Sequence, residues 1–252
     1  MFLEVKNITK DFPVESGVFR RESGVVKALD NVSFSLGEFE TLGIVGESGS
    51  GKTTLAKIIM KLLPATSGDI CFDASRIGNL RKDVQIIFQN PYNSLDPKMR
   101  ILDAIAEPLI IHRICPGKMI KKTVTGLLGM VGLDESALYR LPREFSGGER
   151  QRICIARVLA VEPKCIILDE PVSSLDLTIQ AKLLDLFMDL KKKFNLTYIF
   201  VSHNLAVVKN ITDFVLVMKD GRIVEQGRTA DIFREPGREY TKMLLEAAKV
   251  EG

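Results

Sequence analysis

Gly46-Glu47-Ser48-Gly49-Ser50-Gly51-Lys52-Thr53 is the stretch of sequence that decides the fold of this chain. An apolar run at residues 42–45 precedes it as a candidate buried strand, and residues 55–60 follow it with helical spacing. In that strand–loop–helix context the pattern G-x-x-x-x-G-K-[ST] predicts a phosphate-binding loop rather than a glycine-rich turn. The glycines let backbone N–H groups converge on phosphate oxygens at the N-terminus of a helix. We expect Lys52 to reach the β- and γ-phosphates of a nucleotide and the Thr53 hydroxyl to hold Mg²⁺.

The composition is that of a globular protein. The 252 residues are 46% hydrophobic and 27% charged, which allows a sizeable core. A net charge of +3 is too small to indicate a nucleic-acid partner, and we expect none. The four cysteines form no C-x-x-C pair, so we expect reduced thiols. The sequence has no apolar run of 18 residues and no signal-peptide pattern at its start, so we expect a cytosolic chain unless a membrane partner recruits it.

Hydrophobic spacing predicts an α/β core that is interrupted by a helical segment at about residues 90–160. Residues 14–26, with two arginines and two glycines, are interpreted as an exposed loop. We expect strands at 3–8, 28–36, 69–72, 84–88, 165–168 and 198–201 and a hairpin formed by 214–218 and 222–225, with helices at 101–111, 120–131, 177–194 and 240–249.

A second candidate site follows the apolar strand at residues 165–168, which ends in two acids. In phosphate-loop proteins this position places one carboxylate near Mg²⁺ and leaves the next free to orient a water molecule. We therefore expect Asp169 to lie on the metal side, acting through water, and Glu170 to be the general base.

The third candidate is a helix start. Ser146 is a good N-cap residue, and Gly147 and Gly148 leave the backbone N–H groups that follow it uncovered by side chains. Such a start is able to bind an anion, although an ordinary helix cap would leave the same pattern.

Three motifs, taken in their order along the chain, resemble those of the ATP-binding subunits of ABC transporters. They are the phosphate loop, the Ser-Gly-Gly helix start and the acids after Leu168. The resemblance covers nearly the whole chain and includes Gln89 at a strand end, residues 173–176 after the acids, and His203 after a strand. It implies an α/β fold: a P-loop NTPase core with an N-terminal antiparallel β subdomain and an inserted helical subdomain. The core and β subdomain would be residues 1–89 and 161–252 of a single ATP-binding domain, and the helical insert residues 90–160.

The resemblance also implies a mechanism, in which this chain and a second ATP-binding subunit, identical or similar, close head to tail over two ATP molecules with Mg²⁺. Ser146, Gly147 and Gly148 would grip the γ-phosphate held by the opposite chain. Asp176 would lie at the dimer seam. Gln89 would sense Mg²⁺, and His203 would contact the γ-phosphate. The remaining expected nucleotide contacts are Phe12 under adenine, with Phe19 as its rival, and the loop residues Gly46, Glu47, Ser48, Gly49, Ser50, Gly51, Lys52, Thr53 and Thr54.

One motif departs from the family pattern, which normally reads Leu-Ser-Gly-Gly-Gln. This chain has Phe145 and Glu149 at the two ends of that motif. A negative charge on the first turn of a helix interacts favourably with the helix dipole. The same charge close to a phosphate would be unfavourable, which puts the grip on the opposite ATP in question.

Three stretches, residues 86–97, 171–176 and 237–241, resemble the importer branch that handles dipeptides, oligopeptides and nickel. This resemblance implies membrane permease subunits as partners, an extracytoplasmic substrate-binding protein as an indirect partner, and a peripheral place on the cytoplasmic face of the membrane. We expect the permease to dock around Gln89–Leu95 and Ile101–Leu109. No cysteine-bearing segment follows Tyr240 and Thr241, so an iron–sulfur cluster is not expected. An exporter or lipoprotein-release ATPase is the nearest alternative; a DNA-repair ATPase would need long coiled coils that the sequence lacks.

Overall fold

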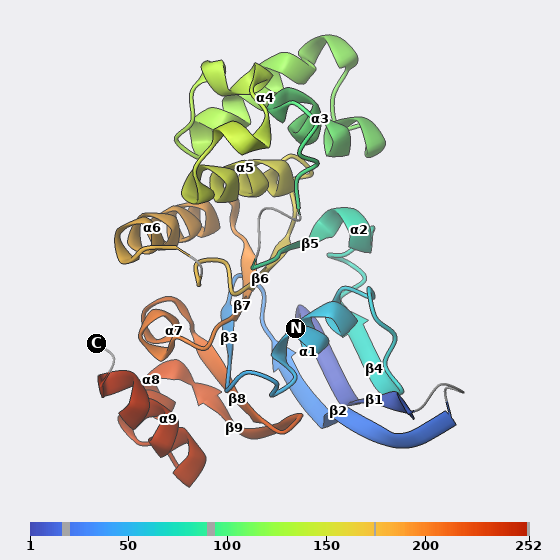
Figure 1. Ribbon diagram of the computed structural model, residues 1–252, viewed down its shortest axis with the longest axis vertical. Coiled ribbons are helices and arrows are strands. Elements are labelled where there is room, and N and C mark those ends of the chain that lie inside the picture. Colours follow the sequence, from blue (N-terminus) through green and yellow to red (C-terminus); the bar gives the residue numbers. More distant parts are fainter. Residues whose placement is uncertain (17–20, 90–93, 174, 251–252) are drawn as a thin grey trace. The chain divides into compact units, whose positions relative to one another are not determined.

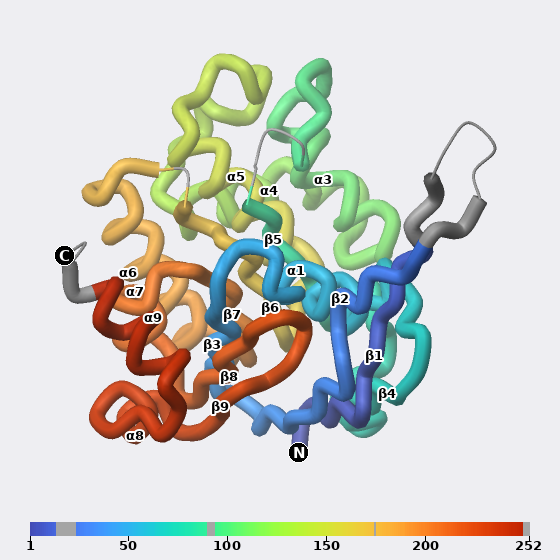
Figure 2. The backbone as a smooth tube through the Cα atoms, turned by 60° about the horizontal axis from the view of Figure 1, so that its bottom comes forward, coloured from blue at the N-terminus to red at the C-terminus, as the bar shows by residue number. Residues whose placement is uncertain are grey.

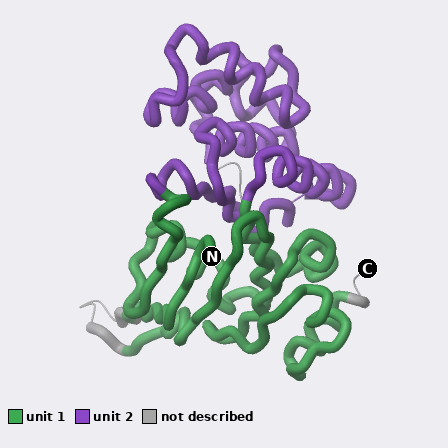
Figure 3. The backbone as a smooth tube through the Cα atoms, turned by 180° about the vertical axis from the view of Figure 1, so that it is seen from behind, with its two compact units in different colours: residues 1–77, 197–252 green, residues 78–196 purple. Residues whose placement is uncertain are grey.

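The computed structural model describes the backbone of all residues except 17–20, 90–93, 174 and 251–252. Side chains are also left undescribed at residues 14–16, 21–23, 249 and 250. The backbone forms two compact units, residues 1–77 with 197–252 and residues 78–196 (Figure 3). The predicted insert, residues 90–160, lies within the second unit.

Unit 1 contains two sheets (Figure 1). The first is antiparallel, in the order β2-β1-β4, with β1 at Leu3–Ser16, β2 at Arg21–Leu36 and β4 at Ser67–Phe72. The second has the order β7-β3-β8-β9, from β7 (Thr197–Val201), β3 (Thr41–Val45), β8 (Phe214–Lys219) and β9 (Arg222–Arg228). Strands β7, β3 and β8 are parallel, and β9 runs antiparallel to β8.

The helices of unit 1 lie along the second sheet. Helix α1, Lys52–Ile59, is on one side of it, and α7 (Leu205–Ile211), α8 (Thr229–Arg234) and α9 (Glu239–Val250) are on the other (Figure 1). Both β3 and β7 are buried along their whole length, as the continuous apolar runs of parallel strands predict. Gly43 gives α7 room, because a Cβ there would lie 2.8 Å from a methyl group of Val208.

The expected loop at residues 14–26 was wrong. Strand β1 continues to Ser16 and β2 begins at Arg21, and the two pair as far as Ser16 opposite Arg21. The pairing is supplied by backbone hydrogen bonds, which need no alternation of apolar residues. Because Gly24, Val25 and Val26 are all exposed, this part of the hairpin lacks the half-buried pattern that usually identifies a strand.

Unit 2 is mostly helical. Its α-helices are α2 (Leu80–Asp83), α3 (Ile101–Ile111), α4 (Ile120–Met130), α5 (Gly147–Leu159) and α6 (Leu177–Phe194), with 3₁₀ helices at Gly117–Met119, Glu135–Tyr139 and Pro142–Glu144. Strands β5 (Val84–Ile87) and β6 (Cys165–Asp169) pair in parallel. The apolar faces of α3, α4 and α5 form the core, in which Ile105, Leu128 and Ile153 are fully buried.

Helix α6 shows how local sequence sets the ends of an element. Asp176 caps its start by accepting a hydrogen bond from the Ile179 N–H at 3.0 Å. Three lysines, residues 191–193, occupy its last turn, where cations interact favourably with the helix dipole. Asn195 ends the helix in the left-handed conformation, with φ 50°. The predicted bounds, 177–194, are confirmed.

Candidate functional site

The phosphate loop lies at the carboxyl end of β3 in unit 1, and its shape depends on glycine. A Cβ on Gly46, whose φ is 150°, would lie 2.1 Å from the Met218 carbonyl oxygen, and one on Gly51, at φ 99°, would lie 2.6 Å from the Ala28 carbonyl. The loop is therefore packed directly on the backbone of β2 and β8. Only glycine fits at these two positions.

Lys52 is buried beneath this loop and curls back onto it. Its Nζ donates hydrogen bonds of 2.7 Å to the carbonyl oxygens of Gly46 and of Glu47. Among the described residues no side chain caps the start of α1, and its first turn carries no acid. A buried ammonium at an uncapped helix start is an environment that favours an anion such as a phosphate group.

The carboxyl end of β7 brings His203 to the same edge of the sheet. Ile44 of β3 pairs with Val201 of β7, and the Ser202 N–H donates to the Ile44 carbonyl at 3.1 Å. Asn204 then caps α7 by accepting from the Val207 N–H at 3.2 Å. His203 is exposed between these two anchored positions, directly beside the strand that enters the phosphate loop.

Phe12 lies on β1 opposite Val26 of β2, and its ring is partly exposed. The Lys10 Nζ lies 5.0 Å from the centre of that ring, a cation–π contact. A flat base could stack on this ring only on the other face or by displacing the lysine. The rival, Phe19, lies outside the described residues.

In unit 2 the carboxyl ends of β5 and β6 bring three predicted residues together. Ile87 pairs with Leu168, so Gln89 and the two acids follow neighbouring strands at one edge. Asp169 is buried and ends β6. Glu170 has a φ of 49°, a left-handed conformation that non-glycine residues rarely adopt and that concentrates at functional sites.

Ser173 links Gln89 to Glu170, a role that was not predicted from the sequence. The Gln89 Nε2 donates to the Ser173 Oγ at 3.1 Å, and that hydroxyl donates to the Glu170 carbonyl at 3.1 Å. Its sequence signals were its place in the motif at residues 173–176 and its position three residues after Glu170, which is the spacing of a turn.

The signature helix α5 begins at Gly147 with a complete capping box. Ser146 Oγ accepts from the Glu149 N–H at 3.4 Å, while the Ser146 N–H and hydroxyl both donate to the Glu149 carboxylate, at 2.8 and 2.7 Å. The two bonds that the Glu149 carboxylate accepts lower its pKa below the ordinary value. The bond from the Ser146 N–H has the larger effect and the bond from the Ser146 hydroxyl the smaller. The negative charge of Glu149 is therefore directed back at its own helix start. Gly148 is buried, and a Cβ on it would lie 2.7 Å from Ile179 of α6.

The apolar face expected to dock a permease is occupied. Ile101, Ile105 and Leu109 of α3 are at most 1% exposed in the core of unit 2, and Leu95 is buried too. Their helical spacing reflects this core and not a docking face. Ile110 and Ile111, at the end of α3, are the exposed apolar residues of this helix. Residues 90–93 of the expected docking segment lie outside the described residues.

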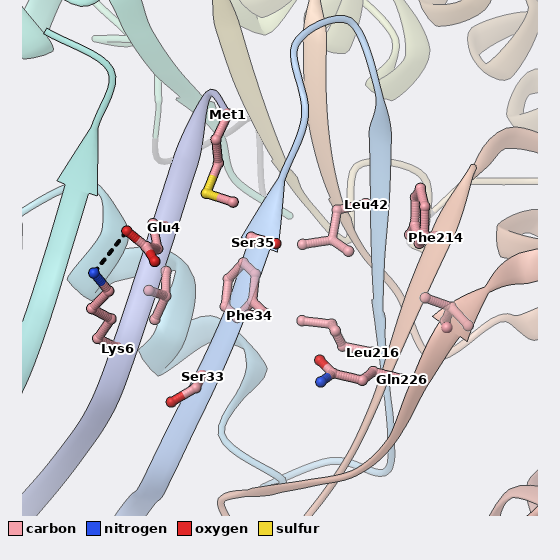
Figure 4. Close-up of a pocket in the computed structure, with 13 residues that line it drawn as sticks. Met1, Glu4, Lys6, Ser33, Phe34, Ser35, Leu42, Phe214, Leu216 and Gln226 are labelled. Atoms are coloured by element: carbon pink, nitrogen blue, oxygen red, sulfur yellow. Dashed lines mark ion pairs between the residues drawn. The ribbon is translucent and has the colours of Figure 1, made fainter.

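A hollow of about 460 Å³ lies elsewhere in unit 1, between β1 and β2 of the first sheet and β3, β8 and β9 of the second (Figure 4). Glu4 and Lys6 in its wall form an ion pair at 2.9 Å. It contains none of the predicted site residues. The nucleotide site is therefore to be sought at the phosphate loop and not in this hollow.

Comparisons with known proteins agree with these motifs. The model of the ABC transporter family matches residues 29–173. The chain is 44% identical to the glutathione import ATP-binding protein GsiA of Pectobacterium atrosepticum and 46% identical to that of Escherichia coli, in each case over 98% of this chain and 41% of the relative. It thus spans about two fifths of the length of these curated relatives.

Two solved structures resemble most of this chain. A dimeric post-hydrolysis state of the ATP-binding cassette MJ0796 with ADP and Pi is 28% identical, with a TM-score of 0.76 over 90% of this chain and 98% of that one. The cbiO1 structure from Clostridium perfringens, part of the ABC transporter complex cbiONQ, is also 28% identical, with a TM-score of 0.77 over 99% and 98%. The α/β fold of an ABC cassette, with its antiparallel β subdomain and helical segment, is confirmed, and the chain belongs to the ABC transporter family.

Proposed function

We propose that this chain binds and hydrolyses ATP and so energises a membrane importer. The observation that carries the proposal is the buried Lys52 ammonium beneath a glycine loop at the uncapped start of α1. This arrangement suits the phosphates of a nucleotide, and Lys52 would exchange its bonds to Gly46 and Glu47 for bonds to phosphate oxygens. The nucleotide-binding core and β subdomain would be residues 1–89 and 161–252, with the insert at 90–160.

The residues present suit Mg²⁺ held mainly by phosphate and water. The described residues contain no group of three or more His, Cys, Asp or Glu side chains that could hold a metal. This is the usual situation for Mg²⁺, which keeps several waters and takes one or two protein ligands. Thr53, Gln89 and, through water, Asp169 would hold it. When bound, Mg²⁺ neutralises charge that develops on the β- and γ-phosphates.

Glu170 would accept the proton of the attacking water, and His203 would donate a hydrogen bond to the γ-phosphate. The left-handed backbone at Glu170 and the Gln89–Ser173 link fix the chain on both sides of this carboxylate. A catalytic base has to be held within hydrogen-bond reach of its water, so this rigidity supports the assignment.

A second copy or a similar chain would complete the site. Ser146, Gly147 and Gly148 would bind the γ-phosphate held by the opposite chain, where their backbone N–H groups and the helix dipole favour negative charge. Asp176 would lie at the seam while also capping α6. The dimeric state of the MJ0796 cassette supports a dimer here.

Between peptides and nickel-like metal ions, we propose peptides as the substrate class, because the relatives at 44–46% identity are named for import of glutathione, a tripeptide. Permease subunits would dock on unit 2, where Ile110 and Ile111 are exposed, and an extracytoplasmic binding protein would deliver the substrate. The chain would work at the cytoplasmic face of the membrane as a peripheral subunit. No helix in the described part of the chain is long and apolar enough to cross a bilayer.

The test is steady-state ATP hydrolysis by the wild type beside Glu170→Gln, with light scattering to follow dimerisation. We expect the variant to lose hydrolysis by at least a hundredfold and to form a stable dimer with ATP, because it binds ATP without a base. Glu162→Gln is a matched control: Glu162 lies in the same unit, is exposed and has a φ of 52°. Equal hydrolysis by wild type and Glu170→Gln would contradict the role of Glu170. A wild type that fails to bind ATP would contradict the function itself.

A further inference from the structure

The start of helix α9 reaches the phosphate loop, although 193 residues of sequence separate the two contacting residues. The Glu47 N–H donates a hydrogen bond of 3.4 Å to the hydroxyl oxygen of Tyr240. Tyr240 is half-buried, and burial is the main cause that raises the pKa of its hydroxyl. The hydroxyl therefore stays protonated at neutral pH and accepts this bond as a neutral group.

The peptide groups of Glu47 are held on both sides. Its carbonyl oxygen accepts from the Lys52 Nζ at 2.7 Å and from the Ser50 N–H at 3.2 Å, while its N–H is held by Tyr240. When Lys52 turns to a phosphate, one of the bonds on the carbonyl side is lost. The Tyr240 bond lies on the other side of the residue and can persist.

Further contacts hold the Tyr240 ring and the phosphate loop. The Lys219 Nζ, at the end of β8, lies 4.7 Å from the centre of the ring. The turn that follows β8 also holds the loop, because the Gly221 N–H donates to the Ser50 carbonyl at 3.2 Å. Figure 2 shows the tip of the β8–β9 hairpin beside the start of α1.

The start of α9 is itself anchored. The Glu225 carboxylate of β9 accepts hydrogen bonds from the Gly237 N–H at 2.7 Å and from the Arg238 N–H at 3.3 Å. Thr241, next to Tyr240, is buried. Tyr240 thus projects from a fixed helix start, which a residue needs if it is to position another.

We propose that Tyr240 is a positioning residue of the phosphate loop: its hydroxyl fixes Glu47 and keeps the loop in the shape that accepts a nucleotide. The inference rests on the proposed ATP binding. Tyr240 acts through Glu47 and touches no reacting atom. Loss of its hydroxyl should therefore weaken nucleotide binding and leave the rate of the chemical step nearly unchanged.

The test is Tyr240→Phe in the full chain, with ATP and ADP affinities measured by calorimetry and KM and kcat by steady-state hydrolysis. We expect both affinities to fall and KM to rise by about threefold to tenfold, the loss of one hydrogen bond. The value of kcat should stay within about twofold. Tyr139→Phe is the matched control, because Tyr139 is an exposed tyrosine of unit 2 whose ring also lies near a lysine, Lys121 at 5.6 Å.

The outcomes separate this inference from the function on which it rests. A wild type that binds no nucleotide would overturn both. A wild type that binds ATP, with Tyr240→Phe binding it equally well, would overturn only the role of Tyr240. A fall in kcat of more than tenfold at unchanged KM would overturn it as well, since a positioning contact at the loop should act on binding. Melting curves of the nucleotide-free variants check that the ring alone preserves the fold.

Discussion

Glu149 differs from the glutamine that the family pattern has at this position, and the substitution Glu149→Gln tests what that difference does. In the structure the carboxylate accepts from the N–H and from the hydroxyl of Ser146. A glutamine oxygen can accept the same two bonds, but without charge. The change therefore isolates the charge of Glu149 while keeping the shape of the capping box.

The stability of the variant should fall slightly. Removing a charge from the first helical turn costs about 0.3–1 kcal/mol, and a charged acceptor binds more strongly than a neutral one. We expect a loss of about 1 kcal/mol at pH 7, which is a melting temperature lower by about 2–4 °C in a chain of this size. The pKa of Glu149 is lowered in the folded chain, so its contribution is present above the ordinary value of 4.5 and is lost as the pH falls through the lowered value. The two melting temperatures should converge in acid.

ATP-driven dimerisation of Glu149→Gln should become tighter, although its stability falls. The Ser146 hydroxyl must leave Glu149 before it can donate to a phosphate on the opposite chain. Leaving a neutral amide instead of a carboxylate costs about 1 kcal/mol less, which corresponds to about fivefold tighter association for each site. Loss of a negative charge near the phosphate acts in the same direction.

The assay is light scattering with ATP in a Glu170→Gln background, with and without Glu149→Gln. Glu144→Gln is a matched control, because the Glu144 carboxylate also accepts a backbone bond three residues back, from the Leu141 N–H at 2.6 Å, with no serine involved. The control should leave dimerisation unchanged. If Glu149→Gln weakens the dimer or leaves it within twofold, then the Ser146–Glu149 bond does not compete with phosphate, and the reasoning is refuted.

Three further predictions concern packing. Within the described residues, neither polar atom of the buried Gln151 amide has a hydrogen-bond partner. Gln151→Met should therefore raise the free energy of unfolding, measured in urea, by about 1–3 kcal/mol. A decrease would show that the amide has a partner. Gly46→Ala should abolish ATP binding in calorimetry, because its Cβ would overlap a carbonyl oxygen of β8 at 2.1 Å; retained binding would contradict the packing. Burial raises the pKa of Cys154 to about 12 and also raises the pKa of Cys165. An alkylating reagent at pH 8, followed by mass spectrometry, should therefore modify the exposed Cys71 first and the two buried cysteines only after unfolding.

The longer elements could be predicted from the sequence because their signals are local. Helix α3 has the predicted bounds, 101–111, and α6 begins at its Asp176 cap and ends before Asn195. Helices α7 and α8 were missed. They are seven and six residues long, and helices this short are stable only through packing on a sheet, which periodicity does not report.

The chemical roles of the site residues could be predicted from the sequence, but their hydrogen-bond partners could not. The sequence identified Lys52 and Glu170 through motif spacing. It contained no signal for the hydrogen bonds that Lys52 donates to the carbonyls of Gly46 and Glu47, since these bonds depend on the backbone conformation of the loop. It also suggested Ile101–Leu109 as a docking face, because an apolar stripe has the same spacing whether it meets a partner or its own core.

Three of the polar groups proposed to bind ATP or its Mg²⁺ share one property in this structure. Lys52 is bonded to two loop carbonyls, Ser146 to Glu149, and Gln89 to Ser173. Binding a nucleotide then means exchanging hydrogen bonds rather than forming new ones, and the net gain is the difference between two bonds, about 1 kcal/mol for each group. A gain this small for each group explains why closure would need several groups acting together on a charged γ-phosphate. It also explains why losing that phosphate would be enough to reopen the dimer, since Ser146 can then return to Glu149 in its own chain.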